Sequence, residues 1–361
     1  MSLVSPGLPS RRIASVDALR GLTVAAMLLV NNPGDWGHIY WPLEHAEWHG
    51  CTPTDLIFPF FLFIVGVSAA LALGPRIDAG ASPGPLRAAV VQRGLRIIGL
   101  GLLLHALAWW LMHKPEFRVM GVLQRIGLCF IAVGVVALWL RERRQWWVLL
   151  GLLVGYGALL QFGPTLQKLG SFNQRLDTAV LGRWAYEWDA ATGIAFDPEG
   201  LLSTLGALAT TVFGLICGGL LRRGQVRGLL LTGIAAALVG WWWSGWLPFN
   251  KQLWTPSFVL WTGGWAAVAL AAAHAWIDRL GHRPWGRAFG LNAIGAYAGA
   301  WMCTVFLAGF GWMEPLYTRV FGPLGPRLGP EGQSLAFAVA FVAVWAVIVW
   351  ALDRRGWYWK I

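Results

Sequence analysis

The sequence predicts an all-α polytopic membrane protein of about ten transmembrane helices, with both termini in the cytoplasm. The 361 residues are 57% hydrophobic and 12% charged with a mean hydropathy of +0.57. A soluble globular protein carries about 25% charged residues, so this composition indicates an integral membrane protein. Two further observations support the fold class: a series of long apolar runs, and arginines that gather in alternate connections between them.

The apolar runs approach the length of a membrane helix, which needs about 20 mostly apolar residues. Charged and Pro/Gly-rich breaks place them near residues 15–32, 54–73, 87–112, 119–140, 145–162, 199–221, 227–246, 254–277, 286–309 and 335–353. The fifth run is among the shortest. The 25 tryptophans agree with this assignment, because indole is favoured at both interfaces of a bilayer.

Basic residues set the predicted topology. Arginines precede the first run, separate the second from the third, and follow the fourth, sixth, eighth and tenth. Positive residues are retained on the cytoplasmic side, which places both termini in the cytoplasm. The extracytoplasmic side then receives segments 33–53, 113–118, 163–198, 247–253 and 310–334.

The remaining bulk properties narrow the functional classes. The net charge of +11 does not indicate nucleic acid binding, because the basic residues are spread over short connections where they meet anionic lipid. The four cysteines show no CxxC pair and no metal-ligand spacing, so neither a metal site nor a disulfide framework is predicted. Residues 1–12 do not resemble a cleavable signal peptide, and we expect them to form a cytoplasmic tail before the first span. Residues 1–361 are expected to form one transmembrane domain.

The segment from Asn31 to Phe63 is the most informative part of the chain. It holds His38, His45 and His49 together with three tryptophans, between two apolar runs. Imidazole titrates near neutrality, so its presence at a bilayer edge indicates proton-transfer or group-transfer chemistry. We expect residues 33–53 to form an extracytoplasmic or re-entrant active-site loop.

Two side chains flank His45 in the sequence with suitable chemistry. Asn31 ends the first run, and an amide there can orient an imidazole or stabilise an oxyanion. Asp55 opens the second run, where it could fix the neighbouring chain or only complement the helix dipole. A loop histidine is ordinarily solvated or packed, but the tryptophan-rich surroundings favour a partly buried pocket.

Other polar residues lie at the ends of several runs. Asp17 and Arg20 can pair at i,i+3, although Arg20 could also contact an anionic ligand that enters from the cytoplasm. Arg125, at the start of the fourth run, could pair with Asp55 or bind a sugar hydroxyl. Asn292 is a candidate buried amide in the ninth run.

Two further clusters suggest a binding rim. Asp197 and Pro198 suit an N-cap and a first helical turn, which leaves Glu199 without a structural reason. Asn250, Lys251 and Trp254 form a polar and aromatic rim that is typical of carbohydrate contact or of an interfacial aromatic belt. These residues could line one channel, as in a transporter or in an enzyme that reacts across the membrane.

The motifs carry a family resemblance. In chain order they are SVDALRGL, LVNN, EHAEWHGCTPTDLIFPFFLFIVG, GVLQRIG, FDPEGLLST, NKQLWTPSF and GLNAIGAY. Their order resembles the heparan-α-glucosaminide N-acetyltransferase family, and in particular its bacterial members, which lack the large lumenal domain of the animal enzyme. The resemblance runs through nearly the whole chain. It implies an enzyme of the bacterial inner membrane that transfers the acetyl group of cytoplasmic acetyl-CoA to the amine of an extracytoplasmic glucosamine.

The resemblance also assigns residue roles. His45 matches the family's catalytic histidine and Asn31 its catalytic asparagine, whereas His38 and His49 do not match. A small amino sugar or a cell-wall fragment is the expected acceptor, and a homodimer and no metal are expected. The predicted acceptor-binding residues are Asp55, Arg125, Glu199, Asn250, Lys251 and Trp254, and the predicted acetyl-CoA-binding residues are Arg20, Arg93, Arg96 and Asn292.

Two mechanisms and two rival functions stay open at this point. His45 could act as a general base for direct transfer, or it could carry the acetyl group itself. Direct transfer is favoured, because the sequence shows no evident carboxylate partner for His45. The rival functions are a proton-coupled sugar transporter and an O-acyltransferase that acts on a cell-envelope polysaccharide.

Overall fold

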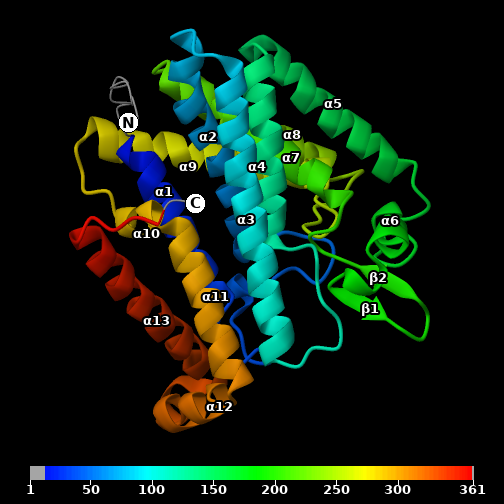
Figure 1. Ribbon diagram of the computed structural model, residues 1–361, viewed down its shortest axis with the longest axis vertical. Coiled ribbons are helices and arrows are strands. Elements are labelled where there is room, and N and C mark those ends of the chain that lie inside the picture. The colour runs from blue at the N-terminus through cyan, green and yellow to red at the C-terminus, as the bar shows by residue number, and fades with distance from the viewer. Residues whose placement is uncertain (1–12, 360–361) are drawn as a thin grey trace.

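The structure is a computed structural model that describes residues 13–359, and it is a bundle of long helices (Figure 1). Each apolar run of the sequence overlaps one long helix. These are α1 (Ala14–Val30), α2 (Ile57–Asp78), α3 (Pro83–Leu111), α4 (Val122–Trp139), α5 (Glu142–Gln161), α7 (Ser203–Arg222), α8 (Val226–Trp243), α9 (Pro256–Ala273), α11 (Ala293–Gly309) and α13 (Gly325–Arg354). The predicted all-α membrane fold is confirmed.

By length and composition, seven helical segments within residues 13–359 can cross a membrane. They are Pro53–Asp78, Pro83–Leu111, Val122–Trp139, Ser203–Arg222, Val226–Trp243, Pro256–Arg279 and Met313–Arg354. The apolar helix α11 is shorter, and α1 has 17 residues with Asp17 and Arg20 among them. Ten spans and two cytoplasmic termini therefore remain predictions.

Several runs depart from uninterrupted α-helices. The ninth run is divided at Asn292, which separates α10 (Arg287–Leu291) from α11. Helix α9 continues as a π-helix over His274–Arg279, and α13 contains a non-helical break at Gly329, whose φ is +71°. The break agrees with the glycine there, because positive φ costs glycine little.

The connection 163–198 carries structure of its own. It contains helix α6 (Phe172–Val180) and an antiparallel hairpin of β1 (Glu187–Asp189) and β2 (Ile194–Phe196), which lie beside the bundle (Figure 1). Helix α12 (Met313–Leu316) and a π-helix over Tyr317–Phe321 precede α13. Short 3-10 turns cover Trp41–Leu43, Pro53–Leu56, Gly182–Trp184 and Gly322–Leu324.

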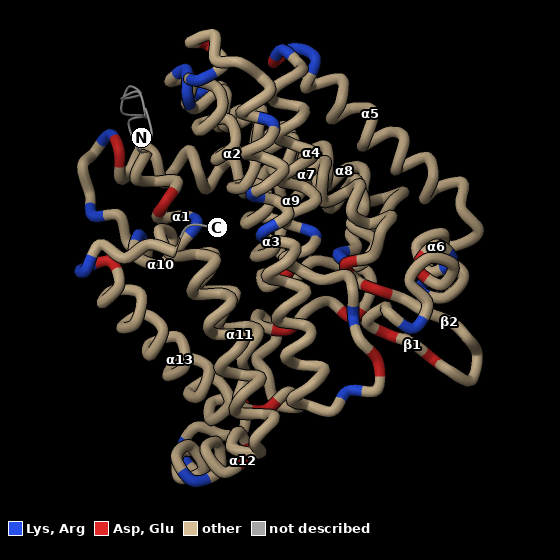
Figure 2. The backbone as a smooth tube through the Cα atoms, viewed as in Figure 1, with Lys and Arg blue, Asp and Glu red and all other residues tan. Residues whose placement is uncertain are grey.

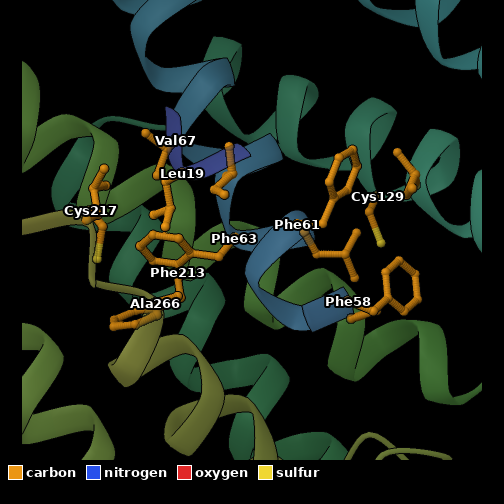
Figure 3. Packing of buried hydrophobic residues seen from close by; sticks show 14 of the residues in the cluster. Leu19, Phe58, Phe61, Phe63, Val67, Cys129, Phe213, Cys217 and Ala266 are labelled. Atoms are coloured by element: carbon orange, nitrogen blue, oxygen red, sulfur yellow. The ribbon is translucent and has the colours of Figure 1, made fainter. Parts of the chain in front are cut away.

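Helix α2 lies at the centre of the core, where it packs on α7, α4 and α9. The rings of Phe63 and Phe213 meet at 5.9 Å between centroids, and Figure 3 shows them together with Val67 and Cys217. The backbones of α2 and α7 also touch, because a Cβ on Gly214 would overlap the carbonyl oxygen of Phe63. Small residues at such contacts let membrane helices approach closely.

Connections predicted to be extracytoplasmic lie together at one end of the bundle. Gly50 N–H donates to Phe249 O at 2.8 Å, and the Trp48 indole donates to Leu166 O at 2.9 Å. Connections predicted to be cytoplasmic meet separately, where Arg222 pairs with Asp78 and Glu142. Charged residues are concentrated at helix ends and in connections (Figure 2). The contacts agree with the alternation of loops that the arginines predict.

The α2–α7 contact predicts that a single methyl group at Gly214 destabilises the protein. Gly214→Ala should lower stability by about 1–3 kcal/mol, as overpacking a core does, despite the better helix propensity of alanine. Gly151 is the control, because a Cβ added there meets no atom within 4 Å. Thermal unfolding in detergent should give a lower midpoint for Gly214→Ala only. Equal midpoints for the two variants would contradict the close packing.

Candidate active site

A cavity of about 510 Å³ lies where the predicted extracytoplasmic connections meet. This volume lies within the range of ordinary ligand pockets, about 300–1,000 Å³. Its wall combines aromatic rings with charged and amide side chains. Five of the residues predicted from the sequence line it, namely Asn31, His45, Glu199, Lys251 and Trp254.

His45 and Asp55 form the central contact of the site. His45 Nδ1 lies 2.7 Å from Asp55 Oδ1. The carboxylate accepts a hydrogen bond from Nδ1–H, so the neutral ring carries its proton there and presents the lone pair of Nε2. The His45 side chain is 45% exposed, whereas that of Asp55 is completely buried. The imidazole therefore stands at the cavity with a fixed tautomer.

Local sequence places Asp55 accurately. Its Oδ2 accepts hydrogen bonds from Thr52 N–H at 3.0 Å, from Thr52 Oγ1 at 3.1 Å and from Ala46 N–H at 3.1 Å. Thr52-Pro53-Thr54-Asp55 is thus a capping arrangement at the start of the α2 segment, with proline in its first turn. Asp55 does more than complement the helix dipole, because it also ties the histidine loop to the helix.

Lys251 brings a cation to the same pair. Its Nζ lies 3.0 Å from both ring nitrogens of His45 and 3.5 Å from Asp55 Oδ1. Burial lowers the pKa of Lys251 below its ordinary value, although Asp55 and Glu199 act in the opposite direction. The imidazole is therefore flanked by one carboxylate and one amine.

Trp254 forms part of the buried wall of the cavity. It is 1% exposed, and its indole N–H donates to Thr210 Oγ1 at 3.0 Å. Its φ of +54° is unusual for a residue other than glycine. Such strained residues are concentrated at functional sites.

A second part of the cavity wall is built by an ion network around Arg118. The guanidinium donates to both carboxylate oxygens of Asp197, at 3.0 and 2.6 Å, and to Glu199 at 2.5 Å. Burial acts to raise the pKa of Glu199, but Arg118 and Arg125 hold it below its usual value. Glu199 therefore presents a negative charge at the cavity.

Segment 197–200 is held from behind by two further side chains. Arg125 donates from Nη2 to Pro198 O at 3.0 Å and to Ser203 Oγ at 2.5 Å. Asp177 accepts hydrogen bonds from the backbone N–H groups of Asp197 at 3.1 Å and of Leu201 at 3.2 Å. Burial raises the pKa of Asp177 to about 6. These contacts fix the backbone that carries Glu199.

Three sequence-based assignments change here. Arg125 is fully buried and contacts this backbone, so it neither pairs with Asp55 nor lines the cavity. Asp197 binds Arg118 instead of capping α7, whose N-cap is Leu202. Asn250 is also buried, and its amide donates to Trp48 O at 2.8 Å, which fastens the histidine loop to the 247–253 connection.

The four residues predicted to bind acetyl-CoA do not line this cavity. Arg20 bonds Asp17, as the spacing predicts, and also Gly290 O at 2.7 Å. The Arg93 guanidinium lies over the Phe130 ring, 5.2 Å from its centroid. Arg96 is exposed. Asn292 is buried beside a separate aromatic cavity of about 570 Å³, and its Nδ2 has no hydrogen-bond partner.

Sequence reasoning missed several cavity residues. Arg118 lies in segment 113–118, which the sequence predicts only to be an extracytoplasmic connection, and the sequence predicts no role for Tyr186, Tyr297 or Trp301. Glu199, which has no structural reason in the sequence, is the one signal that points to such a residue, because a carboxylate near a membrane needs a cationic partner. Nothing in the local sequence identifies Arg118 as that cation.

Comparisons with known proteins agree with the predicted resemblance. A family model described as heparan-alpha-glucosaminide N-acetyltransferase, catalytic, matches residues 12–169. The chain is 26% identical to the heparan-alpha-glucosaminide N-acetyltransferase of Homo sapiens over 422 aligned positions, which cover 97% of this chain and 60% of that protein. It is 25% identical to the Mus musculus protein of that name over 430 positions, which cover 98% and 61%. The chain thus spans about 60% of the length of these relatives.

The buried Asp177 predicts a pH dependence of stability. Its folded-state pKa of about 6 exceeds the ordinary 3.8, so its contribution to stability falls as pH rises from 3.8 to 6 and is constant above. The change amounts to about 3 kcal/mol. As the pH is raised from 3.8 to 6, the thermal unfolding midpoint of the wild type should fall relative to that of Asp177→Asn. Asp189→Asn is the control, since hydrogen bonds to Thr192 and Ala191 lower the pKa of Asp189, and the same fall there would contradict the assignment.

Proposed function

We propose that the protein is a transmembrane N-acetyltransferase of the inner membrane. It moves the acetyl group of cytoplasmic acetyl-CoA to the amine of an extracytoplasmic glucosamine or a related amino-sugar fragment. The observation that carries the proposal is the His45–Asp55 contact at the wall of a ligand-sized cavity. The matched family region, residues 12–169, includes both residues.

In the direct route, His45 acts as the general base. Its Nε2 removes a proton from the acceptor ammonium, and the free amine then attacks the thioester carbonyl. The carbon–sulfur bond breaks, and the departing thiolate takes up the proton held by the imidazolium. The nitrogen of the new amide then loses its remaining extra proton to the neutral imidazole, which releases it to solvent. Asp55 stabilises that imidazolium through Nδ1–H, at the 2.7 Å contact.

In the second route, His45 Nε2 attacks the thioester, the carbon–sulfur bond breaks to release the thiolate, and the amine later takes the acetyl group from Nε2. The sequence-based preference for direct transfer rested on the lack of an evident carboxylate beside His45. Asp55 is such a carboxylate, so that reason for the preference does not hold. Both routes use the same tautomer of His45. Rapid quenching of the reaction, followed by a search for acetylated His45, would distinguish them, because only the second route forms that intermediate.

The other cavity residues have complementary roles in the proposal. Asn31 polarises the acyl carbonyl from the end of α1, and Lys251 supports the developing oxyanion with its N–H groups. Glu199 attracts the acceptor ammonium, while Trp254 provides an aromatic wall. Asp55, Arg125 and Asn250 support acceptor binding from behind the cavity wall.

The donor is proposed to enter from the predicted cytoplasmic ends of α1 and α3. Arg20, Arg93 and Arg96 offer guanidinium groups for the phosphates of coenzyme A. Arg20 and Arg93 are close enough for their charges to interact, which makes this region attractive to an anion. Asn292 contributes an amide near the same ends. The protein is proposed to act as a homodimer without a metal.

Sealed vesicles test the proposed reaction. Labelled acetyl-CoA is placed on the predicted cytoplasmic face and glucosamine on the other, and acetylated sugar is counted on the glucosamine side. We expect product that requires both substrates. Movement of unmodified glucosamine without product would identify a transporter instead, and acetylation of polysaccharide hydroxyls alone would identify an O-acyltransferase.

Substitutions at the His45–Asp55 pair should reduce transfer strongly. His45→Ala should abolish it, and Asp55→Asn should lower kcat about 10²–10⁴-fold, the contribution of general acid–base catalysis. His38 and Asp35 form a matched pair in the same loop, at 2.7 Å, but neither lines the cavity. His38→Ala and Asp35→Asn should keep kcat within about twofold, and a comparable loss in these controls would contradict the assignment.

A further inference from the structure

Lys251 places a primary amine at the position that the acceptor amine must reach. Its Nζ lies 3.0 Å from both ring nitrogens of His45 and borders the cavity, where the side chain is 22% exposed. The proposed reaction brings an acetyl thioester and a basic imidazole to the same point. An amine so placed competes with the acceptor for the acetyl group.

The surroundings of Lys251 determine whether its amine can react, because only the neutral form is a nucleophile. Burial lowers the pKa of Lys251, while the carboxylates of Asp55 and Glu199 act to raise it. The net direction is downward, so the neutral fraction at a given pH exceeds that of a solvated lysine.

We propose that Lys251 is an acetylation site that reacts when the acceptor is absent. The inference rests on the proposed function, because it uses the same acetyl thioester. Nζ attacks the thioester carbonyl, a nitrogen–carbon bond forms, and the carbon–sulfur bond breaks. The proton that leaves the nitrogen passes through His45 to the thiolate, which departs as a free thiol.

The product is a dead end and not a transfer intermediate. An amide does not pass its acetyl group to a sugar amine at a useful rate, unlike a thioester or an acetyl-imidazole. Acetylation also removes the positive charge beside Asp55 and adds bulk at the cavity wall. Acceptor activity should therefore fall in proportion to the acetylated fraction, and bound acceptor should protect Lys251.

The sequence provides internal controls, because it contains four lysines: Lys114, Lys168, Lys251 and Lys360. Lys114 borders the same cavity at an exposed position. Lys168 is 36% exposed and does not line the cavity, although it pairs with Glu187, which does. Lys360 lies outside the described residues. Uncatalysed acetylation would favour the more exposed amines, so selectivity for Lys251 is diagnostic.

The test is peptide mass spectrometry of the full-length protein in detergent after incubation with deuterated acetyl-CoA and no acceptor. Lys251 should become labelled at least tenfold faster than Lys114 and Lys168. Below the pKa of Lys251, its labelling rate should rise close to tenfold for each unit that the pH is raised, because the neutral fraction of the amine rises by that factor. Glucosamine should suppress the label. Lys251→Arg should remove it, whereas Lys168→Arg should not.

A second arm uses S-acetyl-N-acetylcysteamine, a small acetyl thioester that does not need the coenzyme A site. Preferential labelling of Lys251 without any acetylated sugar would support the inference and count against the proposed function. Acetylated sugar without label on Lys251 would overturn the inference and leave the proposed function intact. Absence of preferential label in both arms would also overturn the inference.

Discussion

The site depends on one buried carboxylate, that of Asp55. A buried charge is costly unless it is paired and hydrogen-bonded, and here each oxygen has partners. One oxygen accepts the N–H groups of Ala46 and Thr52, while the other faces His45 and Lys251. The same group therefore begins the α2 segment, closes the histidine loop and fixes the imidazole tautomer. Loss of this charge would disturb helix start, loop and chemistry together.

The second wall of the cavity follows the same principle with a different cation. Arg118 pairs with both Asp197 and Glu199, and the three groups come from two connections that are far apart in the chain. Asp177 and Arg125 secure the intervening backbone through its N–H and carbonyl groups. The cavity thus has two charged walls, each held by a buried carboxylate, in connections that meet at one end of the bundle.

The helix bundle supplies the rigid base for these connections. Helices α2 and α7 touch through their backbones at Gly66 and Gly214, so the starts of both helices are fixed relative to each other. The His45–Asp55 contact depends on the first helix, and the Glu199 wall leads into the second. Packing of α2 on α7 therefore fixes the positions of the His45 and Glu199 sides of the cavity relative to each other.

The sequence alone determined the helical membrane fold and the family resemblance. Apolar runs of near-bilayer length are local properties, and each motif lies within a short segment, which explains why these two predictions are confirmed. The active-site loop and the topology that the arginines indicate stay predictions. Only the tertiary structure decided which charges meet. Arg118 joins Glu199 across 81 residues, Lys251 reaches His45 across 206, and Arg125 turns to the backbone, away from the cavity. Pairing energies between buried charges depend on distance in space, and no local pattern in the chain encodes that distance.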